Sequence, residues 1–191
     1  MYKNLLLSAL LLIMCPGLSF ADSLQIGFND SSAQIEATIP TQRDSYGLTE
    51  INVRGLYNEK SDTRIASAGF NVLGSLNAQS LPGVYFGAGI KVYTGKSIED
   101  DILSMSLGGI LKASPASWQG LGFSTSYFYS PQIFTGLDSK RMSEFETSVS
   151  FEFIPRKARV FISYNNIHTD FDITASRTID ESVRLGISLG Y

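Results

Sequence analysis

Cysteine and histidine are almost absent from this chain, whose 191 residues include one of each. A single cysteine cannot form an internal disulfide, and a single histidine cannot build an ordinary zinc site. A basic excess is also missing, because 15 Lys and Arg stand against 18 Asp and Glu for a net charge of −3. Nucleic-acid binding depends on such an excess. The composition therefore excludes nucleic-acid-binding and zinc-dependent classes, and it implies no cofactor.

Long hydrophobic runs are missing too, except near the N-terminus, where Leu5–Met14 is almost continuously apolar. Ten residues are too few for a membrane-spanning helix, which needs about 20. A lysine precedes the run, and Ser19–Ala21 has the small-x-small pattern of a signal-peptidase site. We therefore expect residues 1–21 to be a cleaved signal peptide and 22–191 to form one domain. Lipidation at Cys15 is the alternative, but the methionine before it is too large for a lipoprotein signal.

Apolar residues recur at every second position along the mature chain, and no segment shows helical spacing. This period of two is typical of β-strands with one apolar and one polar face. Eight strands of about nine to twelve residues are expected near 46–57, 65–73, 84–93, 103–111, 121–129, 145–153, 158–168 and 183–191. Two shorter candidates, 24–28 and 34–39, precede them.

Strand length indicates where these strands lie. A tilted strand needs about 9–11 residues to cross a bilayer, whereas strands of soluble proteins usually have about five or six. The polar face is rich in Gly and Ser, which suits a small lumen better than a solvent surface. The pattern predicts an all-β fold, an antiparallel up-and-down transmembrane β-barrel of eight to ten strands in the outer membrane.

The expected orientation has both termini in the periplasm. Residues 154–157 then form a tight periplasmic turn, and residues 130–142 and 169–181 form extracellular loops of 13 residues each. Aromatic side chains favour membrane interfaces. They fall at the periplasmic rim (Tyr46, Trp118, Phe151, Phe153 and Tyr191) and at the outer rim (Tyr57, Tyr127, Tyr129 and Phe145).

The last strand carries the most specific pattern. It ends on an aromatic residue and has an apolar residue at every second position before it: Val183, Leu185, Ile187, Leu189 and Tyr191. This pattern is similar to the signal that outer-membrane barrels present to the barrel-assembly machinery. An exposed edge strand can pair by backbone hydrogen bonds while alternate side chains give specificity.

Thr125–Pro131, with the sequence TSYFYSP, and the last strand resemble the YfaZ family of small Gram-negative outer-membrane proteins. The length, the signal peptide and the strand spacing agree with this resemblance across the mature chain. The resemblance implies a barrel without an assigned activity. It transfers no catalytic or binding residue.

Charged residues on the polar face define two functional hypotheses. Side chains at alternate positions of a strand share a face, and we call this assignment parity. Parity places eight charged residues in the lumen: Glu50, Arg54, Lys91, Glu144, Glu146, Glu152, Arg159 and Arg184. Four acids and four bases suggest ion pairs that plug the interior, because unpaired buried charges are costly. Inward Tyr85, Tyr93, Phe128 and Phe161 add bulk. We therefore expect a structural or interaction barrel with a largely closed lumen; a narrow channel for ions or small solutes is the alternative.

Candidate catalytic and metal-binding residues are few. His168 shares parity with Val160 and Ile162, so we expect it at the outer rim, pointing outward, and a lipid-modifying enzyme is a distant third hypothesis. An acidic group comprising Glu99, Asp100, Asp101, Asp170 and Asp172 fits either a divalent cation or, more simply, solvated loops. We expect no enzymatic activity. The expected partners are outer-membrane lipids and lipopolysaccharide, and we expect a monomer.

Overall fold

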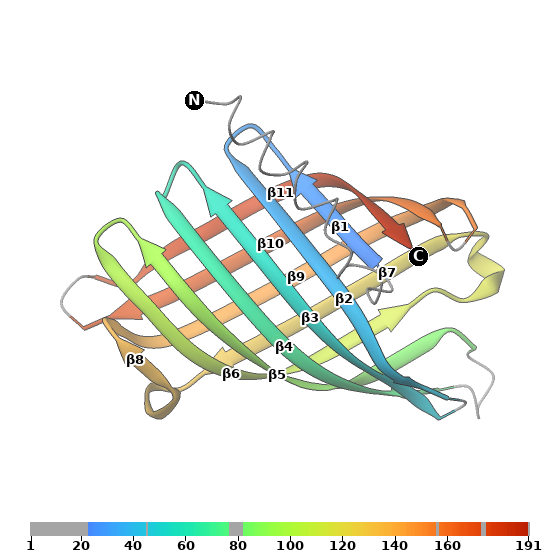
Figure 1. Cartoon of the computed structure of the whole chain (residues 1–191), viewed down its shortest axis with the longest axis horizontal. Helices are drawn as coiled ribbons and strands as arrows, with labels where there is room; N and C mark the ends of the chain where they lie inside the picture. Colours follow the sequence, from blue (N-terminus) through green and yellow to red (C-terminus); the bar gives the residue numbers. More distant parts are fainter. Residues whose placement is uncertain (1–22, 45, 77–81, 156, 173–174, 191) are drawn as a thin grey trace.

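The computed structural model describes residues 23–44, 46–76, 82–155, 157–172 and 175–190, almost all of them in β-strands (Figure 1). The predicted signal peptide, its alternative lipidation site and Tyr191 lie outside the described residues. Among the described residues, no helix is long and apolar enough to cross a membrane. The strands are β1 (Ser23–Phe28), β2 (Ser32–Arg43), β3 (Gly47–Asn58), β4 (Thr63–Ser75), β5 (Val84–Ser97), β6 (Asp100–Ala113), β7 (Leu121–Ser130), β8 (Thr135–Leu137), β9 (Ser139–Ile154), β10 (Ala158–Phe171) and β11 (Arg177–Gly190).

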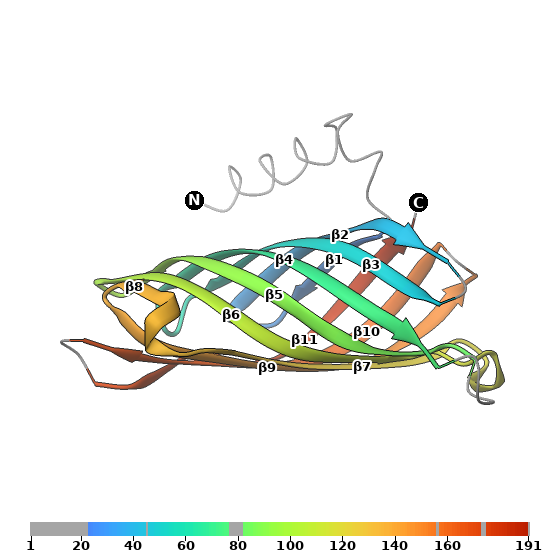
Figure 2. The ribbon, with the colours of Figure 1, turned by 90° about the horizontal axis from the view of Figure 1, so that it is seen from below.

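Ten antiparallel strands close into a barrel (Figures 1 and 2). Each long strand pairs with its neighbours in chain order, and β1 closes the ring by pairing with β11, from Ser23 opposite Gly190 to Phe28 opposite Leu185. Both short N-terminal candidates are therefore wall strands, and the barrel has ten strands rather than eight. Each of the ten strands has a partner on both sides, but β1 is short and pairs with β11 only from Leu185 to Gly190, so β11 extends beyond it toward Arg177. The three-residue β8 pairs with Ile102–Ser104 of β6, next to the β5–β6 turn.

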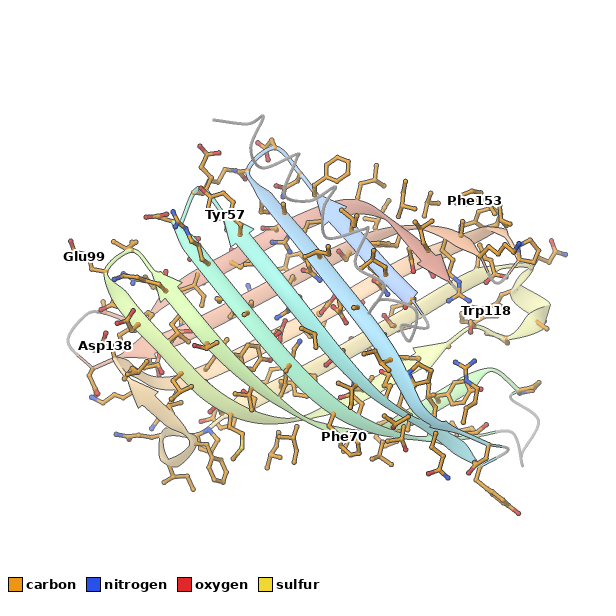
Figure 3. All side chains as sticks on the ribbon, viewed as in Figure 1. Tyr57, Phe70, Glu99, Trp118, Asp138 and Phe153 are labelled. Atoms are coloured by element: carbon orange, nitrogen blue, oxygen red, sulfur yellow. The ribbon has the colours of Figure 1, made fainter. Side chains whose placement is uncertain are left out.

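The barrel has two ends, which we call the terminus end and the loop end. The terminus end carries the start of β1, the end of β11 and the β2–β3, β4–β5, β6–β7 and β9–β10 turns. Two short 3-10 helices connect strands, with Ala116–Trp118 at the terminus end and Gln132–Phe134 at the opposite, loop end. In Figure 3 Tyr57, Glu99 and Asp138 lie toward the loop end, and Trp118 and Phe153 toward the terminus end.

Apolar side chains cover the outside of the barrel through most of its length. In β4, Phe70 and Val72 point outward and are 47% and 53% exposed, whereas Ser67 and Asn71 point inward and are buried. The same holds in β11, where Val183, Leu185, Ile187 and Leu189 all point outward. Water is a poor solvent for such a surface and lipid a good one, so the barrel has the polarity of a transmembrane barrel.

This polarity reverses near the loop end. There a group of inward side chains is apolar and fully buried, including Met142, Ile167 and Ile179, and outward neighbours such as Arg141 and Thr178 are polar. A barrel wall with apolar residues inside and polar residues outside is solvated by water. The barrel therefore consists of a lipid-facing section and a water-facing section at the loop end.

The predicted extracellular loops are shorter than expected because the strands continue into the water-facing section. β9 already begins at Ser139, so the predicted loop 130–142 is reduced to the segment holding the second 3-10 helix and β8. β10 runs to Phe171 and β11 begins at Arg177, so the predicted loop 169–181 is also mostly strand. The prediction was wrong because it traced outward apolar residues, and these end where the lipid-facing section ends.

Short polar side chains fix two of the turns. Asn29 Oδ1 accepts hydrogen bonds from the backbone N–H groups of Ser31 (2.9 Å) and Ser32 (2.7 Å) in the β1–β2 turn. Asp44 Oδ1 accepts equivalent bonds from Tyr46 (2.8 Å) and Gly47 (2.9 Å) in the β2–β3 turn. These N–H donors hold the pKa of the Asp44 carboxyl below its usual range, because they stabilise its charged form. Both turns need an Asx side chain at this place.

Glycines opposite inward aromatic rings let large side chains fit the lumen. Gly108 lies opposite Phe128, and an added Cβ there would come within 2.5 Å of the Phe128 ring. Gly186 lies opposite Phe161, with a corresponding distance of 2.4 Å. Each ring therefore occupies the space that a side chain at the opposite position would need. Glycine is required at both positions because the ring approaches the backbone closely, and not because of the backbone conformation.

Candidate functional site: the interior of the barrel

A charge cluster spans the middle of the lumen. Arg54 of β3 and Glu144 of β9 form an ion pair, although four strands separate β3 from β9 in either direction around the ring. The pair therefore bridges opposite walls. Lys91 Nζ lies 2.9 Å from the second Glu144 oxygen, the Tyr93 hydroxyl donates to that same oxygen, and Arg54 also lies 3.4 Å from Glu146.

The charged side chains of this cluster are almost completely buried. Arg54, Lys91 and Glu144 are 2%, 3% and 1% exposed. Charges removed from water to this degree need partners, because an uncompensated buried charge is strongly destabilising. Glu144 accepts hydrogen bonds from three donors, namely Arg54, Lys91 and Tyr93. Lys91 also lies over the Phe128 ring, 5.3 Å from its centroid.

An apolar layer fills the lumen between this cluster and the loop end. It contains Leu56, Ile65, Tyr93, Ile102, Met142, Ile167, Phe171 and Ile179, contributed by β3, β4, β5, β6, β9, β10 and β11. Their exposed fractions run from 0% to 5%. The layer closes the loop end of the barrel against water, because apolar side chains from seven strands meet there without access for solvent.

A second charged network lies beside this layer. Arg184 donates to Asp180 at 2.7 Å and to the Ser32 hydroxyl at 3.0 Å, and Asn58 donates to the same Asp180 oxygen at 2.7 Å. Arg184 and Asp180 are each 1% exposed. Sequence parity had placed Arg184 in the lumen but missed Asp180, because Asp180 lies in a segment that was expected to be loop. The network ties β11 to β2 and β3.

The terminus end, in contrast, is hollow. A cavity of about 530 Å³ opens there, and a smaller one of about 110 Å³ continues toward the charge cluster. We call the larger cavity the vestibule. Its lining is mostly polar and includes Arg43, Glu50, Lys112, Lys157, Arg159 and six serines: Ser23, Ser114, Ser124, Ser148, Ser150 and Ser188.

The predicted lumen charges thus fall into different environments. Arg54, Lys91, Glu144 and Glu146 form the central cluster. Glu50 is buried at the inner side of the vestibule, where it pairs with Lys112 at 2.5 Å, a partner that the parity list omitted. Glu152 and Arg159 pair at 2.6 Å near the mouth, where the Arg159 side chain is 47% exposed.

The surface residues considered for chemistry pair among themselves. His168 points outward, with Nε2 3.5 Å from Asp170 and Nδ1 3.4 Å from the Thr178 hydroxyl. Ser176 donates a hydrogen bond to the same Asp170 oxygen, so this carboxylate links the hydroxyl and the imidazole. In the acidic group, Asp100 pairs with Arg177 at 2.5 Å and Asp172 with Lys140 at 3.0 Å. The described residues contain no group of three or more His, Cys, Asp and Glu side chains that could hold a metal ion.

Comparison with known proteins adds little beyond this fold. No model of a known protein family matches the chain, and no curated protein sequence matches it either. Two solved structures are similar in shape. One is a chain from a study of the in-meso crystallization of membrane proteins, with 12% identity, a TM-score of 0.45, and coverage of 88% of this chain and 82% of that one. The other is described as KdgM porin, with 10% identity, a TM-score of 0.43, and coverage of 88% and 98%.

Proposed function

We propose that this protein is an integral β-barrel of a bacterial outer membrane that acts as a structural or interaction barrel and does not conduct. The closed loop end is the observation that carries the proposal. Any path through the barrel would have to cross the buried Arg54–Glu144–Lys91 cluster. It would then have to cross either the apolar layer or the buried Arg184–Asp180 ion pair beside it. Each of these barriers consists of side chains that are at most 5% exposed.

Membrane placement is supported by the outer surface and by closure of the sheet. Only helices and closed barrels satisfy every backbone polar group inside lipid, and this barrel is closed with an apolar lipid-facing section. An even number of strands brings β1 and β11 to the same end, which we assign to the periplasm. The predicted signal peptide supports export. Membership of the YfaZ family stays a prediction that rests on the short aromatic motif and the last strand.

The remaining proposals concern activity and partners. We propose no catalytic activity. We propose that lipids and lipopolysaccharide contact the outer surface and that the assembly machinery recognises the last strand. The last strand supports this role, because Val183, Leu185, Ile187 and Leu189 form an outward apolar row on a strand that closes the ring. At the loop end, Ile133 and Leu137 are 82% and 61% exposed and offer an interaction barrel an apolar contact surface.

Two measurements on purified protein test the proposal. Unheated and boiled samples in mild detergent should migrate differently on a gel, because a closed barrel resists unfolding by detergent alone. In a planar bilayer the folded protein should give no resolved single-channel steps, whereas a known porin inserted by the same protocol should give them. Well-resolved steps from the wild-type barrel would establish the channel alternative, and recovery of most of the protein in a soluble periplasmic fraction would refute membrane placement.

A further inference from the structure

The charged residues that line the vestibule at the terminus end are mostly cationic. Four of its lining residues are cationic, namely Arg43, Lys112, Lys157 and Arg159, and Glu50 is the only acidic residue among the described lining residues. The cations come from β2, from β6 and, with Lys157 and Arg159, from the β9–β10 turn and the start of β10, so they approach the cavity from three parts of the ring. A concave site with one sign of charge and low-dielectric walls concentrates ions of the opposite sign.

Ion pairs orient Lys112 and Arg159 in the vestibule. Lys112 Nζ lies 2.5 Å from Glu50, which also accepts a hydrogen bond from Asn71 at 3.1 Å. Arg159 lies 2.6 Å from Glu152. Both cationic side chains still face the cavity, with 36% and 47% of their surface exposed. Their orientation is therefore fixed before any ligand arrives, which lowers the entropy cost of binding.

Neutral groups complete the site. Six serine hydroxyls and Thr38 line the cavity, and Tyr85 and Phe161 supply aromatic faces. Hydroxyls donate hydrogen bonds to oxyanions and also bond the polar substituents of an organic solute. A volume of about 530 Å³ falls within the range of small-molecule sites, about 300–1,000 Å³.

We infer that the vestibule is a binding site for a small organic anion bearing several carboxylate or phosphate groups. Because the apolar layer closes the loop end, the anion enters and leaves by the terminus end and does not cross the barrel. Binding depends on the folded barrel alone, so it is measurable in detergent whether or not the membrane assignment holds.

The test is calorimetric titration of the detergent-solubilised full barrel at low ionic strength. Citrate and inorganic pyrophosphate are the two anionic probes, and they separate carboxylate from phosphate recognition; raffinose is the uncharged probe. We expect at least one anion to bind with a one-to-one stoichiometry, and raffinose not to bind. Added salt should weaken binding, because it screens the exposed cations.

Paired charge-neutralising variants locate the site. Arg43→Gln/Lys157→Gln removes two mouth cations and should weaken anion binding about tenfold or more, equivalent to about 1.4 kcal/mol. Lys60→Gln/Arg64→Gln makes the same charge change on the outside of the loop end and should leave the affinity unchanged. Gel mobility of unheated samples checks that both variants fold. The inference is overturned by absence of binding for both anions, by equal loss in both double variants, or by raffinose binding as tightly as the anions.

Discussion

The lipid-facing section and the water-facing section of this barrel use the same strands with opposite polarity. On β11, Ile187 points outward and Ser188 points inward, but nine residues earlier Thr178 points outward and Ile179 inward. The backbone pairing continues across the change, with one irregularity in register between Ile167 and His168 of the neighbouring strand. The comparison shows that the solvent outside the wall, and not the strand itself, decides which face is apolar.

The interior follows the same division. Inside the lipid-facing section the lumen is polar and relies on ion pairs, because outward positions take the apolar residues. Inside the water-facing section the lumen can hold an ordinary apolar core, because the outer face is hydrated. One chain therefore joins a lipid-facing section with a polar lumen to a short water-facing section with an apolar core.

The largest effect should follow from breaking the central charge cluster. Arg54→Ala leaves Glu144 with less compensation in a site that is 1% exposed, and should destabilise the barrel by about 3–5 kcal/mol. Arg159→Ala is the matched control at the mouth; its ion pair is partly exposed and should contribute about 0–1 kcal/mol. Urea unfolding in detergent measures both. Equal losses would mean that the cluster is hydrated.

The apolar layer should respond to truncation like a soluble core. Ile167→Ala removes a side chain that is 0% exposed and should cost about 2–5 kcal/mol of unfolding free energy. Ile162→Ala, on the same strand but outward and 57% exposed, should cost much less in detergent. If the outward variant proved the more destabilising of the two, the assignment of inner and outer faces would be wrong.

An arginine introduced on the outer face should have a different cost in each of the two sections. Ile187→Arg places a cation in the lipid-facing section and should cost about 2–4 kcal/mol if that position lies near the bilayer midplane. Thr178→Arg places the same side chain outward in the water-facing section and should be nearly neutral. Folding titrations into lipid vesicles measure the difference, and similar costs at the two positions would contradict the boundary between the sections.

The smallest predicted effect concerns a loop tip. Ile98 has a φ of 57°, a left-handed conformation that a β-branched residue adopts at a cost. Ile98→Gly relieves that strain and should leave stability unchanged or raise it by up to about 1 kcal/mol, whereas Thr94→Gly, within regular β5, should lower it. A large loss of stability in Ile98→Gly would show that the apolar side chain is needed for packing.

The fold was largely predictable because lipid-facing strands carry a strict period of two. The parity of Val183, Leu185 and Ile187 identified the outer face, and parity also placed Arg54, Lys91 and Glu144 inside. The water-facing section escaped prediction for a physical reason. Its strands carry polar residues outward, and a search for outward apolar rows therefore treats Ser139–Arg141 and Asp180 as loop.

The ion-pair partners of the charged lumen residues were harder to predict than the inward direction of their side chains. Sequence parity says that Arg54 and Glu144 point inward but not that they meet across opposite walls. Lys112 was missed as a partner of Glu50, and Arg159 was expected to be a buried partner although it lies at the mouth. Pairing in a barrel depends on strand stagger, which alternation along a single strand does not encode.

Membrane depth along the outer face of β11 tests the central claim most directly. The predicted mature chain contains no cysteine, so a single cysteine at Thr178, Glu181, Val183, Leu185 or Ile187 can carry a nitroxide without interference. In vesicles, collision with dissolved oxygen should dominate at Val183, Leu185 and Ile187, and collision with a water-soluble nickel complex should dominate at Thr178 and Glu181. Nickel accessibility at all five positions, or oxygen dominance extending to Thr178, would contradict the division into two sections.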